Sequence, residues 1–153
     1  GKHAPWSQSR MPTITREHER EIVEHARATE PYECCGILTG NDDAASHLHR
    51  ITNTSNNPNL YLMDPQQQLD VMLESRKHGR QVLAFYHSHP QGPPYPSATD
   101  VRMAQQSGWL GEDIYYVLVS LADPDKPEIR AFNIMDDGTV IEKPLTIQAT
   151  STS

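Results

Sequence analysis

Short apolar stretches recur along this chain, and most have the length of a β-strand. Three are nearly continuous apolar runs, as buried strands are: residues 35–40 (CGILTG), 81–87 (QVLAFYH) and 114–121 (IYYVLVSL). Residues 47–52 (HLHRIT) alternate between apolar and polar side chains, which also predicts a strand. Two further strands are expected at residues 128–133 and 140–144, around a turn at Asp137-Gly138.

Other segments carry helix signals. Helices favour Ser, Thr or Asp at the N-cap, and such residues predict three helices: residues 15–28 capped by Thr15, residues 65–78 capped by Asp64, and residues 97–106. Residues 90–96 hold four of the twelve prolines, so this stretch is a stiff loop and not a helix or central strand. The resulting order predicts an α+β fold in which helices pack on one mixed, partly curved β-sheet.

Composition limits the classes of function. The chain has 153 residues, the size of one domain, and a hydrophobic fraction of 36%. It carries 13 Lys and Arg against 20 Asp and Glu, a formal net charge of -7, which argues against non-specific binding to nucleic acid or anionic membranes. No apolar run approaches the roughly 18–20 residues that a membrane span needs. We therefore expect no nucleic-acid partner and no membrane.

The chain ends and the cysteines add further expectations. Residues 1–10 lack the apolar core of a secretory signal, and we expect them to be a vector-derived segment. A single domain over residues 11–148 would follow, and then a flexible Thr- and Ser-rich tail over residues 149–153. The only cysteines, Cys34 and Cys35, are adjacent. Neighbouring cysteines pair only with strain, so we expect no disulfide framework and a reducing, cytoplasmic location.

The sequence His87-Ser88-His89 follows the apolar run at residues 81–87. In an extended backbone, residues i and i+2 project from the same face, so two imidazoles can converge on one cation. After the stiff loop comes Asp100, which would be a third protein ligand and leave the fourth position of a tetrahedral zinc to water. Such an open site is typical of a catalytic rather than a structural zinc.

Other polar residues have ordinary explanations as well. Ser97 with Asp100 three residues later matches a helix capping box, although Ser97 Oγ could still face the site. His47 and His49 also form a His-x-His pair, but no carboxylate follows at a comparable distance, so we interpret them as solvent-facing. Glu33 would be a surface glutamate if taken alone, or the base that hydrolysis needs. Five histidines are expected at the surface: His18, His25, His47, His49 and His78.

The spacing of these residues resembles the signature of the JAMM (MPN+) metallopeptidases, a distant Glu followed by H-[ST]-H-x7-S-x2-D. The matching positions are Glu33, His87, Ser88, His89, Ser97 and Asp100, with residues 90–96 as the spacer. The resemblance covers about residues 14–147 and includes the order of elements. Residues 33–36 (ECCG) and 61–65 (YLMDP) are also similar to bacterial members. It implies the JAMM/MPN fold, which is cytidine-deaminase-like.

The resemblance implies a role for each residue of the motif. His87, His89 and Asp100 would bind one zinc ion per chain. Glu33 would accept a proton from the attacking water and pass it to the leaving amine. Ser97 would donate a hydrogen bond to the oxyanion of the tetrahedral intermediate.

The resemblance also implies a substrate class. Family members cleave peptide or isopeptide bonds after the Gly-Gly tail of a ubiquitin-like protein, and such a tail commonly lies beside a sheet edge. Because the segments at residues 51–64 and 106–114 are short, the chain resembles a minimal prokaryotic branch that acts on ubiquitin-like sulfur carriers, including members that release cysteine from the carrier. Tyr61 and residues 93–96 would flank the tail groove or be ordinary core and loop residues. Trp109 would contact a partner or anchor the core. Members of this fold often dimerise, which makes a homodimer one expectation.

Four other functions fit the pattern less well. A non-catalytic scaffold that binds a ubiquitin-like partner would be expected to lack Glu33 or a metal ligand. A zinc deaminase would show H-x-E and a later P-C-x-x-C, and neither occurs. A cysteine protease would use Cys34 or Cys35, but Cys35 leads an apolar strand and no histidine stands out as its partner. A cupin-type barrel would need a glutamate soon after His89, and the next one is Glu112.

Overall fold

The computed structural model describes residues 10–149, within which the chain forms eight strands and three helices. The strands are β1 (Thr13–Thr15), β2 (Cys35–Asn41), β3 (Ala44–Ile51), β4 (Gln81–His89), β5 (Tyr115–Ser120), β6 (Glu128–Ile134), β7 (Val140–Lys143) and β8 (Thr146–Gln148). The helices are α1 (Arg16–Thr29), α2 (Pro65–Lys77) and α3 (Ala98–Ser107). All the expected elements are present with small shifts of their ends, and Thr15, Asp64 and Ser97 cap the helices. The pattern missed β1 and β8, which have three residues each and are too short to show alternation.

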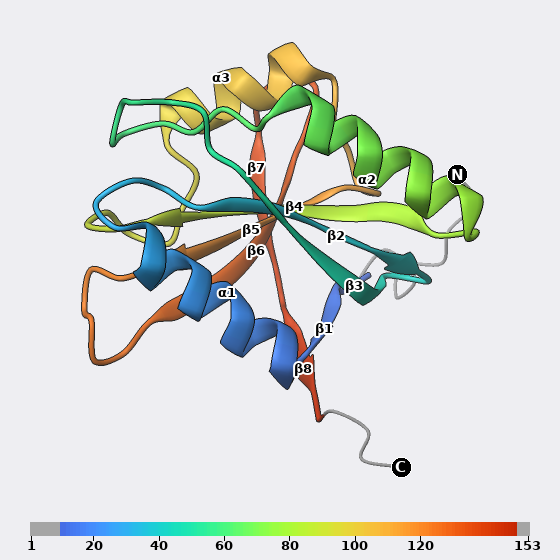
Figure 1. The fold of residues 1–153 in the computed structure, drawn as a ribbon, viewed down its shortest axis with the longest axis horizontal. Helices are drawn as coiled ribbons and strands as arrows, with labels where there is room; N and C mark the ends of the chain where they lie inside the picture. The colour runs from blue at the N-terminus through green and yellow to red at the C-terminus, as the bar shows by residue number, and fades with distance from the viewer. Residues whose placement is uncertain (1–9, 150–153) are drawn as a thin grey trace.

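The strands form one mixed sheet in the order β7-β6-β5-β4-β2-β3-β1-β8 (Figure 1). The β4–β5, β1–β3 and β1–β8 pairs are parallel, and the others are antiparallel. Strands β7 and β8 lie at opposite ends of this order, yet only Pro144 and Leu145 separate them in the chain. The sheet must therefore curl, and the predicted α+β fold with a mixed, partly curved sheet is confirmed.

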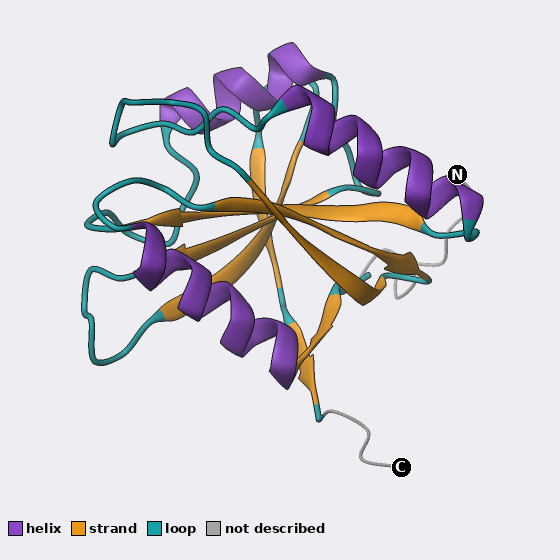
Figure 2. Ribbon diagram, in the orientation of Figure 1, coloured by secondary structure: helices purple, strands orange, loops and turns teal. Residues whose placement is uncertain are grey.

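Helix α1 packs on one face of the sheet, and α2 and α3 pack on the other (Figure 2). Neighbouring residues of β4 consequently enter different cores, with Tyr86 in the cluster that includes α1 and Phe85 in the cluster that includes α2 and α3. By the same alternation, His87 and His89 project from the α2–α3 face. The end of β4 thus presents both imidazoles toward the helix that carries Asp100.

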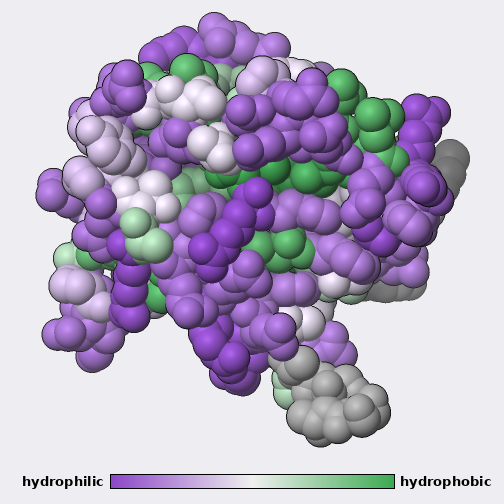
Figure 3. Space-filling view, viewed as in Figure 1, coloured by the Kyte–Doolittle hydropathy of each residue, from purple (hydrophilic) through white to green (hydrophobic). Residues whose placement is uncertain are grey.

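The surface seen in Figure 3 is mostly hydrophilic, with its hydrophobic residues in small separate patches. Among residues 10–149, the exposed large apolar side chains are Met11, Tyr32, Leu62, Leu69, Leu73, Tyr95 and Ile141. Within residues 10–149, no helix is long and apolar enough to cross a membrane.

The surface assignment of histidines was right for His47 and His78 and wrong for the other three, which are half-buried. His25 differs most, because its Nδ1 lies 2.7 Å from the hydroxyl of Tyr86. The Tyr86 ring lies over Gly36 on the neighbouring strand, where any Cβ would collide with it. A glycine on β2 therefore lets a tyrosine on β4 reach a histidine on α1.

Arg10 belongs to residues 1–10, which we expected to be vector-derived, yet its side chain contacts the folded domain. Its Nε and Nη2 donate to the two carboxylate oxygens of Asp43 at 2.8 and 2.7 Å, and its Nη1 donates to Asp113. The expected flexible tail at residues 149–153 and the rest of the expected vector segment lie outside the described residues, apart from residue 149.

Candidate metal centre

The register of two strands brings Glu33 to the histidine pair. Strands β2 and β4 are antiparallel, with Cys35 opposite His87. Two residues further along, Glu33 comes opposite His89 and shares the face of Cys35. Glu33, which would be a surface glutamate if taken alone, is therefore buried.

The first turn of α3 brings in Asp100. Ser97 is the N-cap of this helix, and its Oγ accepts a hydrogen bond from the Asp100 N–H at 3.0 Å. In return, Asp100 Oδ2 accepts the Ser97 N–H at 2.9 Å. This reciprocal capping box holds the carboxylate against the end of β4. The same oxygen faces both imidazoles.

Three donor atoms converge at the centre of this group. His87 Nε2 lies 3.2 Å from His89 Nε2, and Asp100 Oδ2 lies 3.1 Å from the first and 2.9 Å from the second. Around a tetrahedral zinc with bonds of 2.0–2.1 Å, neighbouring ligand atoms are about 3.4 Å apart. With Glu33, the four residues offer ligand atoms that all lie within 4.8 Å of one another, and all four are buried. The group can therefore hold a metal ion with little rearrangement.

The second ring nitrogen of each histidine has a different environment. His89 Nδ1 lies 2.7 Å from the Pro93 carbonyl oxygen, which can only accept a hydrogen bond, so Nδ1 donates and, in the neutral ring, Nε2 keeps a lone pair that a metal ion could use. His87 Nδ1 is buried and makes no hydrogen bond to any described residue. The His87 ring packs against Tyr61, with ring centroids 4.6 Å apart. One ring is therefore oriented by a carbonyl and the other by packing.

Burial and neighbouring charges shift the pKa values of the acidic groups and of His89. Burial disfavours the charged form of Asp100, but the adjacent His87 and His89 hold its pKa well below the usual range. Burial also disfavours a charged His89, yet its hydrogen bonds to Asp100 and Pro93 raise its pKa. Burial raises the pKa of Glu33, with His87 acting in the opposite direction. Glu33 and Asp100 are two carboxyls with opposite shifts, a pattern that favours different chemical roles.

The group opens on a cleft of about 620 Å³ that Glu33, His89 and Ser97 help to line. Glu33 Oε1 is buried and has no hydrogen-bond partner among the described residues. The Ser97 hydroxyl accepts a bond from Asp100 N–H, which leaves its own proton free to donate. Tyr95 and Asn59 lie on the walls of the same cleft.

The sequence of this chain matches a known protein family. A family model described as prokaryotic homologs of the JAB domain matches residues 15–135. This chain belongs to that family. The matched region contains all four residues that could hold a metal ion, so the JAB domain and the candidate centre coincide.

Relatives of this prokaryotic JAB-domain chain carry peptidase names. It is 36% identical over 129 residues to the CysO-cysteine peptidase of Mycobacterium tuberculosis, covering 82% of this chain and 84% of that protein. It is 34% identical over 96 residues to the desampylase of Haloferax volcanii, covering 58% and 69%. The solution structure of a Desulfitobacterium hafniense protein superposes with a TM-score of 0.79 at 34% identity, covering 93% and 96%.

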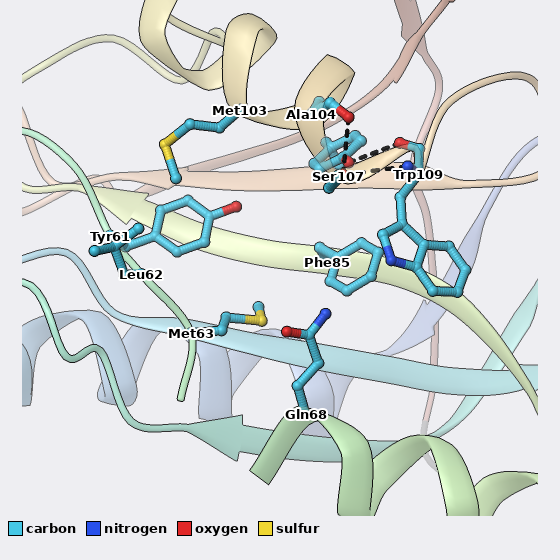
Figure 4. A pocket seen from close by; sticks show the side chains of 10 residues that line it. Tyr61, Leu62, Met63, Gln68, Phe85, Met103, Ala104, Ser107 and Trp109 are labelled. Atoms are coloured by element: carbon cyan, nitrogen blue, oxygen red, sulfur yellow. Dashed lines mark hydrogen bonds between the residues drawn. The ribbon is translucent and has the colours of Figure 1, made fainter. Parts of the chain in front are cut away.

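The JAB-domain structure also places the residues for which the sequence left alternatives open. Trp109 is partly buried and packs against the core, its ring centroid 5.4 Å from that of Phe85. Both residues line an apolar pocket, and Tyr61 forms another of its walls (Figure 4). Since Tyr61 also packs on His87, this ring separates the pocket from the metal-binding group.

Two other groups lie apart from this centre. Cys34 and Cys35 are buried, and burial raises the pKa of each thiol to about 12, which argues against a thiolate nucleophile. The rings of His47 and His49 stack on β3 with centroids 6.3 Å apart. Neither histidine belongs to the metal-binding group found among the described residues.

Sequence reasoning missed two partners of the site. The Pro93 carbonyl orients His89, and the side chain of Asn53 donates a hydrogen bond to the Glu33 carbonyl at 2.8 Å. Every residue has a backbone carbonyl, so the sequence does not show which one contacts His89. Asn53 begins an Asn- and Pro-rich stretch, residues 53–59 (NTSNNPN), and this composition indicates a loop but no role for any one residue.

Proposed function

We propose that this protein is a zinc metallopeptidase that hydrolyses the peptide or isopeptide bond after the C-terminal Gly-Gly tail of a ubiquitin-like or sulfur-carrier protein. The observation that carries the proposal is the convergence of His87, His89 and Asp100 within 3.2 Å of one another, with Glu33 beside them. Two imidazoles and one carboxylate are a donor set that suits zinc. The relatives named as a CysO-cysteine peptidase and a desampylase support the substrate class.

In this mechanism His87, His89 and Asp100 hold the zinc ion. When bound, zinc polarises the scissile carbonyl and lowers the pKa of water at the site. Glu33 takes the proton from the attacking water and delivers it to the leaving amine. Burial raises the pKa of Glu33, so this carboxyl holds a proton more readily, which suits a group that first takes a proton and then gives it up.

Ser97 has two compatible roles in this mechanism. Its oxygen accepts the Asp100 N–H and so holds a metal ligand, while its hydroxyl proton donates to the oxyanion that forms on the scissile carbonyl. Because Ser97 is exposed on the cleft, a substrate carbonyl can approach it. The cap and the oxyanion donor are the same side chain.

The cleft beside the candidate metal centre supports the proposed glycine tail as substrate. Its walls include Asn59 from the loop after β3 and Tyr95 from the proline-rich loop, and the tail would run between them. Glycine residues carry no side chains, so the scissile carbonyl can approach the buried metal-binding group closely. Tyr61 packs on the ring of His87, one of the residues that would hold the metal ion.

We also propose that residues 11–148 form a single catalytic domain that works in the cytoplasm, as a monomer or a homodimer. The adjacent, buried cysteines support a reducing compartment. The interaction is with a protein partner and not with nucleic acid or membrane, in keeping with the net charge of -7.

The experiment that tests this function incubates the zinc-loaded protein with a panel of ubiquitin-like proteins that carry cysteine, a short peptide or a lysine isopeptide after the Gly-Gly tail. Intact-mass measurement should show a product that ends at the second glycine. A non-catalytic scaffold would bind a panel member and leave its mass unchanged. That outcome would contradict the proposed activity.

A further inference from the structure

The peptide group that follows the candidate base is held at both ends by side chains. Its carbonyl oxygen, on Glu33, accepts a hydrogen bond from Asn53 Nδ2 at 2.8 Å. Its N–H, on Cys34, donates to Ser88 Oγ at 2.8 Å. Ser88 stands between the two candidate metal ligands of β4. The peptide plane next to Glu33 is therefore fixed from two sides, and with it the direction in which the Glu33 side chain leaves the backbone.

The position of Asn53 follows from the strand register. In the β2–β3 pair, Cys35 lies opposite Ile51 at the end of the ladder. Two residues further along, Glu33 comes opposite Asn53, where β3 has already ended. A side-chain amide, and not the backbone of a continuing strand, supplies the hydrogen bond to the Glu33 carbonyl.

The other end of the same amide organises the loop beside the cleft. Asn53 Oδ1 accepts the Ser55 N–H at 2.9 Å and the Leu62 N–H at 3.0 Å. These bonds close the loop that starts at Asn53. Leu62 directly follows Tyr61 in the chain, and the ring of Tyr61 packs on His87. One side chain thus connects the base, the loop that lines the cleft and the residue that packs on a metal ligand.

We propose that Asn53 is a positioning residue that aims Glu33 at the attacking water and couples it to the loop on the substrate side. The inference rests on the proposed peptidase function and deepens it. Asn53 acts through the Glu33 backbone and touches neither substrate nor metal. Misplacement of a catalytic group by about 1 Å can lower the rate about 100-fold, so loss of this bond should act on kcat.

The test uses Asn53→Asp in the zinc-loaded protein. Aspartate keeps the oxygen that accepts Ser55 and Leu62 and loses the N–H that binds the Glu33 carbonyl. We expect kcat to fall at least about 10-fold, with KM within about twofold of wild type and an unchanged metal content per chain. Asn53→Ala, which also releases the loop, should both lower kcat and raise KM.

Asn41→Asp is the matched control, because Asn41 Nδ2 also donates to a backbone carbonyl, that of Gly79 at 3.2 Å, but on an exposed part of the molecule. This variant makes the same chemical change and should keep the wild-type kcat. An unchanged kcat in Asn53→Asp, or an equal fall in Asn41→Asp, would overturn the positioning role alone. A wild-type protein that cleaves no member of the panel would overturn the proposed function and this role with it.

Discussion

The Nε2 atoms of His87 and His89 face each other across 3.2 Å, with one carboxylate oxygen of Asp100 close to both. Two ring nitrogens that both present lone pairs repel each other unless a proton or a cation lies between them. His89 Nδ1 donates a hydrogen bond to the Pro93 carbonyl oxygen, so in the neutral ring the Nε2 lone pair points toward His87 Nε2. This geometry could hold a metal ion.

Removing one ligand should remove the metal. His89→Ala should weaken zinc binding by at least about 100-fold, more than loss of an outer partner of a ligand costs, and should abolish cleavage. Metal content after dialysis against a weak chelator measures this. His47→Ala is the matched control, since His47 belongs to the other His-x-His pair and is exposed. Equal zinc content in the two variants would contradict the assignment.

Ser97 should affect both the stability of the fold and the rate of cleavage. Thr15, which caps a helix outside the site, is the control that separates these two effects. Each residue caps a helix through a capping box, so Ser97→Ala and Thr15→Ala should each lower the free energy of unfolding by about 1 kcal/mol. Only Ser97→Ala should also lower kcat, by about 100- to 1000-fold if the hydroxyl stabilises the oxyanion. Denaturant titrations and steady-state rates measure the two quantities. Similar cleavage rates in both variants would contradict the oxyanion role of Ser97 and support only its role as a helix cap.

The Tyr61 ring should protect the metal-binding group by packing. Tyr61→Phe keeps the ring against His87 and should preserve zinc affinity. Tyr61→Ala exposes that ring and should weaken zinc affinity about 10-fold, as loss of support around a ligand does. Competition with a coloured chelator measures the affinities. If the alanine variant binds zinc as tightly as wild type, the Tyr61 contact has no role in metal binding.

Stability should fall in mild acid because of His25, outside the site. Burial lowers the pKa of His25 to about 4, with Arg50 acting in the same direction and Glu21 against it. Between pH 6.5 and 4 the unfolded chain binds a proton that the folded chain does not, so stability is full above this window and falls as the pH drops through it. His25→Gln should show a shallower loss of melting temperature between pH 7 and 5. Parallel curves for variant and wild type would contradict this.

The sequence was sufficient for the elements with strong local signals. The buried strands are apolar runs, and Thr15, Asp64 and Ser97 are good helix caps. Strands β1 and β8 were missed because three residues carry no period. The burial of His25 was missed because it depends on Gly36 and Tyr86, which meet it only after the sheet has formed.

The same limit applies to the site. His87, His89 and Asp100 lie within one short segment, where strand alternation and a capped helix suffice to predict that they converge. Glu33 depends on the β2–β4 register, which the motif resemblance suggested but local pattern did not. Asn53 depends on the β2–β3 register as well, and no local signal identified it.

The most direct test of the central claim compares wild type with Glu33→Gln, with metal content and cleavage rate determined on the same preparations. Glutamine keeps the size of the side chain and cannot take a proton. We predict about one zinc per chain in both proteins, cleavage of a Gly-Gly-tailed ubiquitin-like protein by wild type, and no detectable cleavage by the variant. Cleavage by Glu33→Gln at the wild-type rate, or by wild-type protein stripped of metal, would contradict the central claim.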